Sequence, residues 1–315
     1  MKKIFFFIVY ITLSIGCFQD ELKKDNSSQS DQYITILGIT QDGGFPHIGC
    51  QKKCCNDFYT GILPKQKVVS LGLIDKLSNQ KFLFEATPDI STQLADLENN
   101  HLKTNSIING VFITHAHIGH YAGLLYFGRE ALGKKNISIY AMPKMKNFLS
   151  NNGPWSQLVS LKNIVFSDLK KDSSLMVSNS LKVTPFLVPH RDEFSETVGF
   201  KIEGKNKSAL FIPDINKWEL WDRDIVEEVK KVDYAFLDAT FLKEGEINRP
   251  MNDVPHPFIE ETIALFKNES LNTKNKIFFI HFNHTNPTLQ SNSKERTKLE
   301  LLGFRFATQG QNFKL

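Results

Sequence analysis

Short apolar runs separated by turn residues dominate the chain from residue 32 onward. The runs are rich in β-branched and aromatic residues and are bounded by Gly, Pro, Asn, Asp or Ser, which is typical of β-strands. The predicted strands are 33–38, 68–75, 81–87, 108–115, 137–142, 181–189, 197–204, 208–214, 234–240 and 276–282.

Helical spacing of apolar residues occurs between some of these strands. It predicts helices over residues 120–132, 221–231, 257–267 and 293–302. Strands in runs with interspersed helices, and without strict strand–helix alternation, favour a layered α/β sandwich with mixed sheets. We therefore expect one domain over residues 32–315.

Residues 1–17 have the pattern of an export signal, in which a basic start and an apolar run at 4–15 precede Gly16. The run is too short to span a bilayer comfortably as a permanent helix. The small residue before Cys17 resembles a bacterial lipobox, which implies a lipid on Cys17; an ordinary signal peptide with an incidental cysteine is the alternative. Residues 18–31 are polar and suit a flexible tether. We expect an exported protein, either periplasmic or attached to the outer membrane.

Composition fits a globular protein, with 41% apolar and 23% charged residues. A chain of 315 residues can bury a full-sized core without disulfides. The formal net charge is +4, and no long block of like charge points to nucleic-acid binding.

A loop that contains Gly and Pro carries three cysteines, Cys50, Cys54 and Cys55, within a span of six residues. Cysteines of an exported protein can pair, but an odd number leaves one over. Adjacent cysteines rarely bond to each other for geometric reasons. The cluster therefore looks more like a set of metal ligands, with free or oxidised thiols as the alternative.

The most informative pattern is THAHIGH at 114–120, which places His115, His117 and His120 directly after an apolar strand. A strand end followed by a tight loop can direct several imidazoles to one point, and neutral imidazole is a preferred ligand for zinc and related metals. The chain has nine histidines in total, so three in six residues are improbable by chance.

Other apolar strands also end in residues that bind metals. They are His190, Asp214, Asp238 and His281. One such residue means little, because a polar group at a strand end usually only satisfies a loop. Four of them after the histidine cluster predict further ligands.

The order HxHxxH, His190, Asp214, His281 resembles the metallo-β-lactamase superfamily, over about residues 32–315. The resemblance implies a four-layer αββα sandwich with mixed sheets. It also implies a first metal on His115, His117 and His190, a second on His120 and His281, and Asp214 between the two. The superfamily motif usually reads HxHxDH, and here Gly119 replaces the Asp. We therefore expect a weaker second site, and a one-metal enzyme is the alternative.

Within the superfamily, four segments resemble the pyrroloquinoline-quinone biosynthesis protein B group. These are ILGITQDGGFPHIGC (36–50), FLDATF (236–241), HFNHTNP (281–287) and FATQGQNFKL (306–315). This group is similar to a cyclic phosphodiesterase group that holds a structural zinc in a Cys-rich loop. That similarity implies a structural zinc on Cys50, Cys54, Cys55 and His284.

The resemblance implies a metal-dependent hydrolase in which metal-bound hydroxide attacks an ester, amide or phosphodiester of a small molecule. Asp214 would fix the metals and accept a hydrogen bond from the nucleophile, and His256 would protonate the leaving group. A surface histidine that caps a helix is the alternative for His256. Zinc is the expected metal, with iron or manganese as alternatives.

Two other classes of function stay open at this point. One is an iron-dependent oxygenase or redox enzyme on the same fold. The other is a non-catalytic, lipid-anchored metal-binding protein. The expected partners are a small-molecule substrate and a membrane reached through Cys17, with no nucleic acid and with a homodimer left open.

Overall fold

The computed structural model describes residues 31–315. The predicted signal at 1–17 and almost all of the predicted tether lie outside the described residues, so export and the lipid on Cys17 stay predictions. Within the described part, none of the helices combines the length and the apolar character needed to cross a bilayer.

The first half of the chain builds a seven-stranded mixed sheet, which the C-terminal strand completes at one edge. The strands β1 to β3 are antiparallel, and β3 to β6 run parallel. In spatial order they are β14 (Asn312–Lys314), β1 (Gln32–Gly38), β2 (Ser70–Asp75), β3 (Gln80–Phe84), β4 (Gly110–Phe112), β5 (Ile137–Ala141) and β6 (Ile164–Asp168).

The second half builds another seven-stranded mixed sheet. The pairs from β10 to β13 are parallel, and those from β7 to β10 are antiparallel. In spatial order the strands are β13 (Arg305–Phe306), β12 (Ile277–Ile280), β11 (Tyr234–Asp238), β10 (Ser208–Ile212), β9 (Val198–Glu203), β8 (Lys182–Leu187) and β7 (Leu175–Met176).

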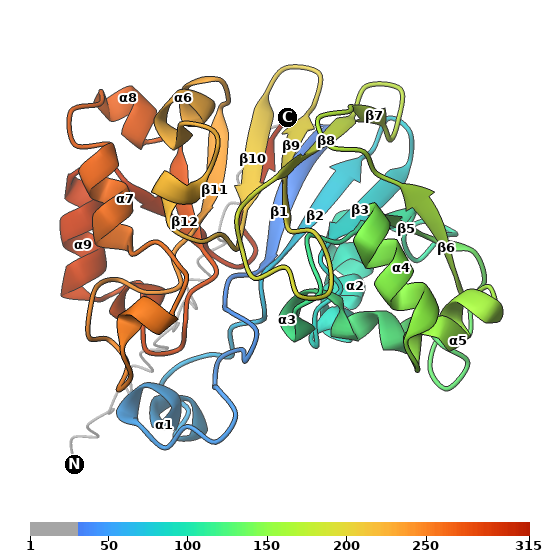
Figure 1. Ribbon diagram of the computed structural model, residues 1–315, viewed down its shortest axis with the longest axis horizontal. Coiled ribbons are helices and arrows are strands. Elements are labelled where there is room, and N and C mark those ends of the chain that lie inside the picture. The colour runs from blue at the N-terminus through green and yellow to red at the C-terminus, as the bar shows by residue number, and fades with distance from the viewer. Residues whose placement is uncertain (1–30) are drawn as a thin grey trace, which may run out of the picture.

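Helices cover the two outer faces, so the predicted αββα sandwich is confirmed (Figure 1). The first sheet is covered by α2 (Ile90–Asp96), α4 (Pro143–Asn151) and α5 (Trp155–Ser160). The second is covered by α6 (Ile225–Lys230), α7 (Ile259–Leu265), α8 (Leu271–Lys274) and α9 (Lys294–Leu301). Two short helices, α1 (Lys53–Tyr59) and α3 (Ile118–Tyr121), lie at the lower edge of the sandwich in Figure 1.

The alternation of side chains along the strands separates two hydrophobic cores. On β1, Ile34 and Ile36 belong to the core between the sheets, whereas Tyr33 belongs to the core under α2. Aromatic rings fill much of the inter-sheet core, where Phe84 stacks on Phe112 with ring centroids 4.8 Å apart. This rigid double core holds the strand ends, and with them the polar side chains that follow each strand.

The predicted helix at 120–132 is wrong in length, because α3 gives way to a 3-10 helix at Ala122–Phe127. The carbonyl of His120 accepts a hydrogen bond from the Ala86 backbone N–H at 2.8 Å. The segment that carries the histidine cluster is therefore held by a contact with the end of β3, which the apolar spacing of the sequence does not predict.

Candidate metal centre

His115, His117, His190 and Asp214 form the first cluster, with ligand atoms all within 4.8 Å of one another. They come from the segments that follow β4, β8 and β10. His115 Nε2 lies 3.4 Å from Asp214 Oδ2, and His190 Nε2 lies 3.2 Å from Asp214 Oδ1. The structure thus brings together the four residues that the sequence placed around the first metal.

Burial sets the protonation of this first cluster. It lowers the pKa of His115 well below its usual range and the pKa of His117 to about 4. Burial alone would raise the pKa of Asp214, but the positive charges of nearby histidines outweigh it and hold the pKa well below its usual range. Neutral imidazoles beside an ionised carboxylate are the forms that bind a divalent metal.

His120, His281 and Asp42 form a second cluster that shares Asp214 with the first. His120 Nε2 lies 3.6 Å from Asp42 Oδ1 and 3.8 Å from Asp214 Oδ2, and His281 Nε2 lies 3.9 Å from the same Asp214 oxygen. On its other side, His120 Nδ1 lies 3.3 Å from Glu85 Oε1. Burial lowers the pKa of His120, but Glu85, Asp42 and Asp214 outweigh it and raise the pKa to about 9.

These two clusters have the donor set that a metal centre requires. Among the residues that the structure describes, His120 Nε2, His281 Nε2 and Asp214 Oδ1 are buried side-chain atoms without a hydrogen-bond partner. Such atoms are costly to bury unless something else satisfies them. Imidazole nitrogens and a shared carboxylate fit zinc or a related divalent cation. The residues present therefore fit the metal centre that the sequence predicted.

Asp238 does not join the first cluster but holds His256 against it. Its Oδ2 accepts a hydrogen bond from His256 Nδ1 at 2.9 Å, and its Oδ1 accepts from the Thr240 hydroxyl at 2.7 Å. The Thr240 hydroxyl also lies 2.8 Å from His281 Nδ1. Burial lowers the pKa of His256, but Asp238 and Asp214 outweigh it and raise the pKa to about 9. His256 is 6% exposed, so the alternative of a surface capping residue does not hold.

Gly119 lies where the sequence predicted a missing carboxylate, and the space beside it holds Asp42. The backbone N–H of Gly119 donates a hydrogen bond to Asp42 Oδ1 at 2.8 Å. A Cβ atom on Gly119 would come within 2.1 Å of that same oxygen. A carboxylate is therefore present at the second cluster, supplied by the loop after β1.

The cysteine loop folds onto His284, which is not a member of the two histidine clusters. Cys50, Cys55 and His284 offer ligand atoms within 4.8 Å of one another, and Cys54 Sγ lies 4.0 Å from Cys50 Sγ. All three cysteines are free thiols. Burial, together with the nearby charges of His47 and Lys52, lowers the pKa of His284 to about 4. A neutral imidazole beside clustered thiols can hold a structural zinc.

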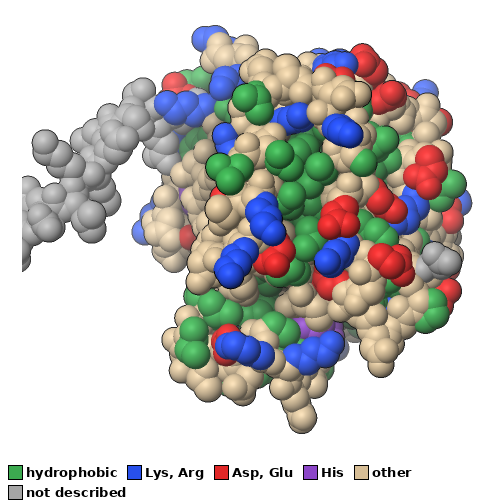
Figure 2. Space-filling view, turned by 90° about the vertical axis from the view of Figure 1, so that its left-hand side faces the viewer, with side chains coloured by type: hydrophobic (Ala, Val, Ile, Leu, Met, Phe, Trp, Pro, Cys, Tyr) green, Lys and Arg blue, Asp and Glu red, His purple; other side chains and the backbone are tan. Residues whose placement is uncertain are grey.

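A polar cavity of about 280 Å³ opens beside the metal clusters. It is lined by His256 and His284, by two cationic side chains, Arg191 and Arg249, and by one acidic side chain, Asp253. Figure 2 shows histidine atoms in a crevice above a lobe at the foot of the molecule. The lobe lies at the height of α1 in Figure 1. The cavity can admit a small molecule to His256, whose Nδ1 lies 3.2 Å from Asp214 Oδ1.

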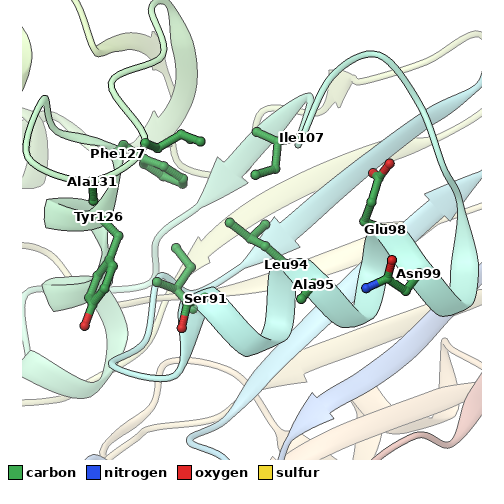
Figure 3. A pocket seen from close by; sticks show the side chains of 11 residues that line it. Ser91, Leu94, Ala95, Glu98, Asn99, Ile107, Tyr126, Phe127 and Ala131 are labelled. Atoms are coloured by element: carbon green, nitrogen blue, oxygen red, sulfur yellow. The ribbon is translucent and has the colours of Figure 1, made fainter.

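A larger and mainly apolar cavity, of about 440 Å³, lies between α2 and the 3-10 helix that follows α3. Figure 3 shows Leu94, Ile107 and Phe127 around it. Its lining includes no histidine or cysteine, so the chemistry belongs to the polar cavity and not to this one.

Sequence reasoning missed Asp42, Glu85, Arg191 and Arg249. Asp42 and Glu85 each follow an apolar strand, which is the same signal that identified His190 and Asp214. Glu85 and His281 also have left-handed backbones, with φ of 75° and 67°. Non-glycine residues hold that conformation only where the surrounding structure enforces it, often at functional sites. The two arginines gave no signal, because their loops approach the site only in the folded protein.

The beta-lactamase superfamily domain matches residues 80–282, and the chain belongs to this superfamily. Within it, the chain is similar to coenzyme PQQ synthesis protein B. The protein of that name from Methylorubrum populi is 25% identical over 310 residues, which cover 88% of this chain and 98% of the relative. The one from Acinetobacter baylyi is 25% identical over 304 residues, with the same coverage of 88% and 98%.

Solved structures share the fold. Zinc-bound PqqB from Methylobacterium extorquens has a TM-score of 0.73 at 22% identity, covering 90% of this chain and 100% of that one. A diphosphatase of the PhnP family has a TM-score of 0.62 at 20% identity, covering 90% of this chain and 96% of that one. The first of these proteins binds zinc and the second is a diphosphatase, so one fold accommodates both properties.

Proposed function

We propose that this protein is a metal-dependent hydrolase acting on a small anionic ester, with a phosphodiester as the substrate class that the site favours. The single observation that carries the proposal is the pair of histidine clusters joined by Asp214, with His256 beside Asp214 lining a polar cavity. Ester and amide hydrolysis use the same kind of centre, but Arg191 and Arg249 favour a substrate with negative charge.

Zinc or a related ion, when bound here, would polarise the substrate and lower the pKa of a coordinated water towards ~7. His115, His117 and His190 would hold one ion, and His120 and His281 the other. Asp214 lies close to histidines of both clusters, so it would fix the position of one metal ion relative to the other.

His256 would protonate the leaving group. Its Nδ1 donates to Asp238, so Nε2 is the nitrogen that can act on a substrate in the cavity that His256 lines. The buried Asp238 carboxylate favours the protonated imidazole, which is the form required of a general acid. Arg191 and Arg249 would bind the substrate anion, and Phe241 contributes an apolar wall.

A separate, structural zinc on Cys50, Cys54, Cys55 and His284 is part of the proposal. His284 follows the second-cluster ligand His281 by three residues, so an ion there would tie the cysteine loop to the end of β12. Mass spectrometry under native conditions would detect it. A Cys55→Ser variant is expected to lose one zinc, and unchanged zinc content would rule out this site.

The proposed function is tested by metal analysis of the protein as isolated, followed by assays with phosphodiester, ester and amide probes. We expect zinc or manganese and turnover of bis(p-nitrophenyl) phosphate. His117→Ala should abolish that turnover, whereas His101→Gln, a histidine outside the site, should not. Iron with substrate-dependent oxygen consumption would replace this proposal with an oxygenase.

Attachment to a membrane through Cys17 remains a separate proposal, supported by the apolar run and Gly16 before it. Expression of the full chain in a bacterium with lipoprotein processing should place it in the detergent phase of a Triton X-114 partition. A Cys17→Ser variant should move to the aqueous phase. Equal partition of the two proteins would exclude the lipid.

A further inference from the structure

Asp42 lies in a turn directly after β1, some seventy-seven positions before the glycine that it contacts. Its side chain is held from two directions. The Gln41 amide donates to Oδ2 at 2.9 Å, and the Gly119 backbone N–H donates to Oδ1 at 2.8 Å. The carboxylate is 18% exposed and faces His120, so it is fixed at the second cluster.

The two histidines of that cluster leave nitrogen atoms free for a ligand. His120 and His281 are fully buried, and the Nε2 atom of each has no hydrogen-bond partner among the described residues. A ligand atom from each of Asp42, His120 and His281 lies within 4.8 Å of the others. Two imidazole nitrogens and one carboxylate around a common point make a chemically sound cation site.

Gly119 shows that the carboxylate occupies this space to the exclusion of any other side chain. A Cβ atom there would lie 2.1 Å from Asp42 Oδ1 and 2.6 Å from Asp42 Cα, which backbone adjustment cannot relieve cheaply. The φ of Gly119 lies outside the left-handed range, so its backbone conformation does not require glycine. Glycine is present at 119 because Asp42 needs the room.

We infer that Asp42 is a ligand of the second metal ion, taking the position that a side chain at residue 119 would otherwise fill. The centre then has a histidine-rich first site and a second site made of Asp42, His120 and His281, with Asp214 shared. The inference rests on one part of the proposed function, which is that the protein has a metal centre. It does not depend on the substrate.

Counting metal in purified full-length protein tests the inference directly. Wild type, Asp42→Asn, Gly119→Ala and Asp42→Gly/Gly119→Asp would be loaded with zinc, dialysed together and analysed by mass spectrometry. Asp42→Asn keeps the oxygen that accepts from Gly119, so the loop stays in place while the charge is lost. We expect one zinc per chain fewer in Asp42→Asn and in Gly119→Ala.

The double variant moves the carboxylate from one chain position to the other and should recover the missing zinc. Asp168→Asn, an exposed aspartate paired with Lys146, is the matched control and should bind as the wild type does. Circular dichroism would confirm that each variant is folded. Wild-type zinc content in Asp42→Asn, or a loss that the double variant does not recover, would overturn the inference. Absence of any hydrolysis with the expected zinc counts would defeat only the proposed function.

Discussion

Replacing Asp238 with asparagine tests how the buried carboxylate and His256 work together. Asp238 is fully buried and accepts from His256 Nδ1 at 2.9 Å, the Ile215 N–H at 3.1 Å, the Thr240 N–H at 2.9 Å and the Thr240 hydroxyl at 2.7 Å. An asparagine whose oxygen faces Thr240 must turn its NH₂ group towards His256 and Ile215. His256 can accept from that group by changing tautomer, but the Ile215 N–H cannot.

The magnitude follows from that one unsatisfied donor. A buried N–H without an acceptor costs about 1–3 kcal/mol of the free energy of unfolding. For a domain of this size, each kcal/mol lowers Tm by about 2–4 °C. Thermal denaturation followed by circular dichroism would measure the change. Asp233→Asn is a suitable control, because Asp233 accepts from the Ser208 N–H at the other end of the same strand.

The catalytic effect should depend on the leaving group. Asparagine removes the carboxylate that accepts from His256 and leaves Asp214, 3.2 Å from Nδ1, as its anionic partner. The protonated imidazole is then less favoured and the general acid is weakened, which lowers kcat by up to about 10²–10⁴-fold for an alkoxide leaving group. A nucleoside 2′,3′-cyclic phosphate provides such a group. Bis(p-nitrophenyl) phosphate releases a stable phenolate and needs little protonation, so its kcat should change far less. Equal losses on both substrates would refute the reasoning, because Asp238 would then act through the metal ligands or the fold.

Three further predictions concern single side chains. Glu85→Gln removes the carboxylate that contacts His120 Nδ1 and should weaken zinc binding about 10–100-fold. A competition titration with a chelating dye would measure the affinity, and an unchanged value would show that Glu85 only fills space. Arg249→Ala should raise KM for phosphodiesters with little change in kcat, and equal KM values for charged and uncharged esters in wild type would contradict the anionic-substrate assignment. Burial lowers the pKa of His101 below its usual value of 6.5. The unfolded chain therefore binds the proton more readily, so the free energy of unfolding should fall as pH drops below 6.5, and His101→Gln should show a shallower fall in urea denaturation at several pH values.

The sequence alone determined most of the sandwich, because its strands are apolar runs whose ends are marked by turn residues. The run at 234–240 became β11 (Tyr234–Asp238), and the run at 208–214 became β10 (Ser208–Ile212). A strand that is buried on both faces is a nearly continuous apolar run, so it can be recognised in the sequence before its neighbouring strands are known. By contrast, the α-helix predicted at 120–132 ends at Tyr121 and continues as a 3-10 helix. There the backbone N–H of Ala86, just after β3, donates a hydrogen bond to the His120 carbonyl.

The sequence also identified the donor types of the metal centre, since THAHIGH and the later strand-end residues carry their chemistry locally. Only the tertiary structure decided which groups complete it. Glycine at position 119 looked like a lost carboxylate, and the fold places Asp42 in that space from a loop remote in sequence. A ligand set depends on atoms a few ångströms apart, whereas a sequence orders residues only along the chain. The contact between the β1 loop and α3 exists because β1 and β4 run in the same direction in one sheet, so that the segments following them meet at the same edge.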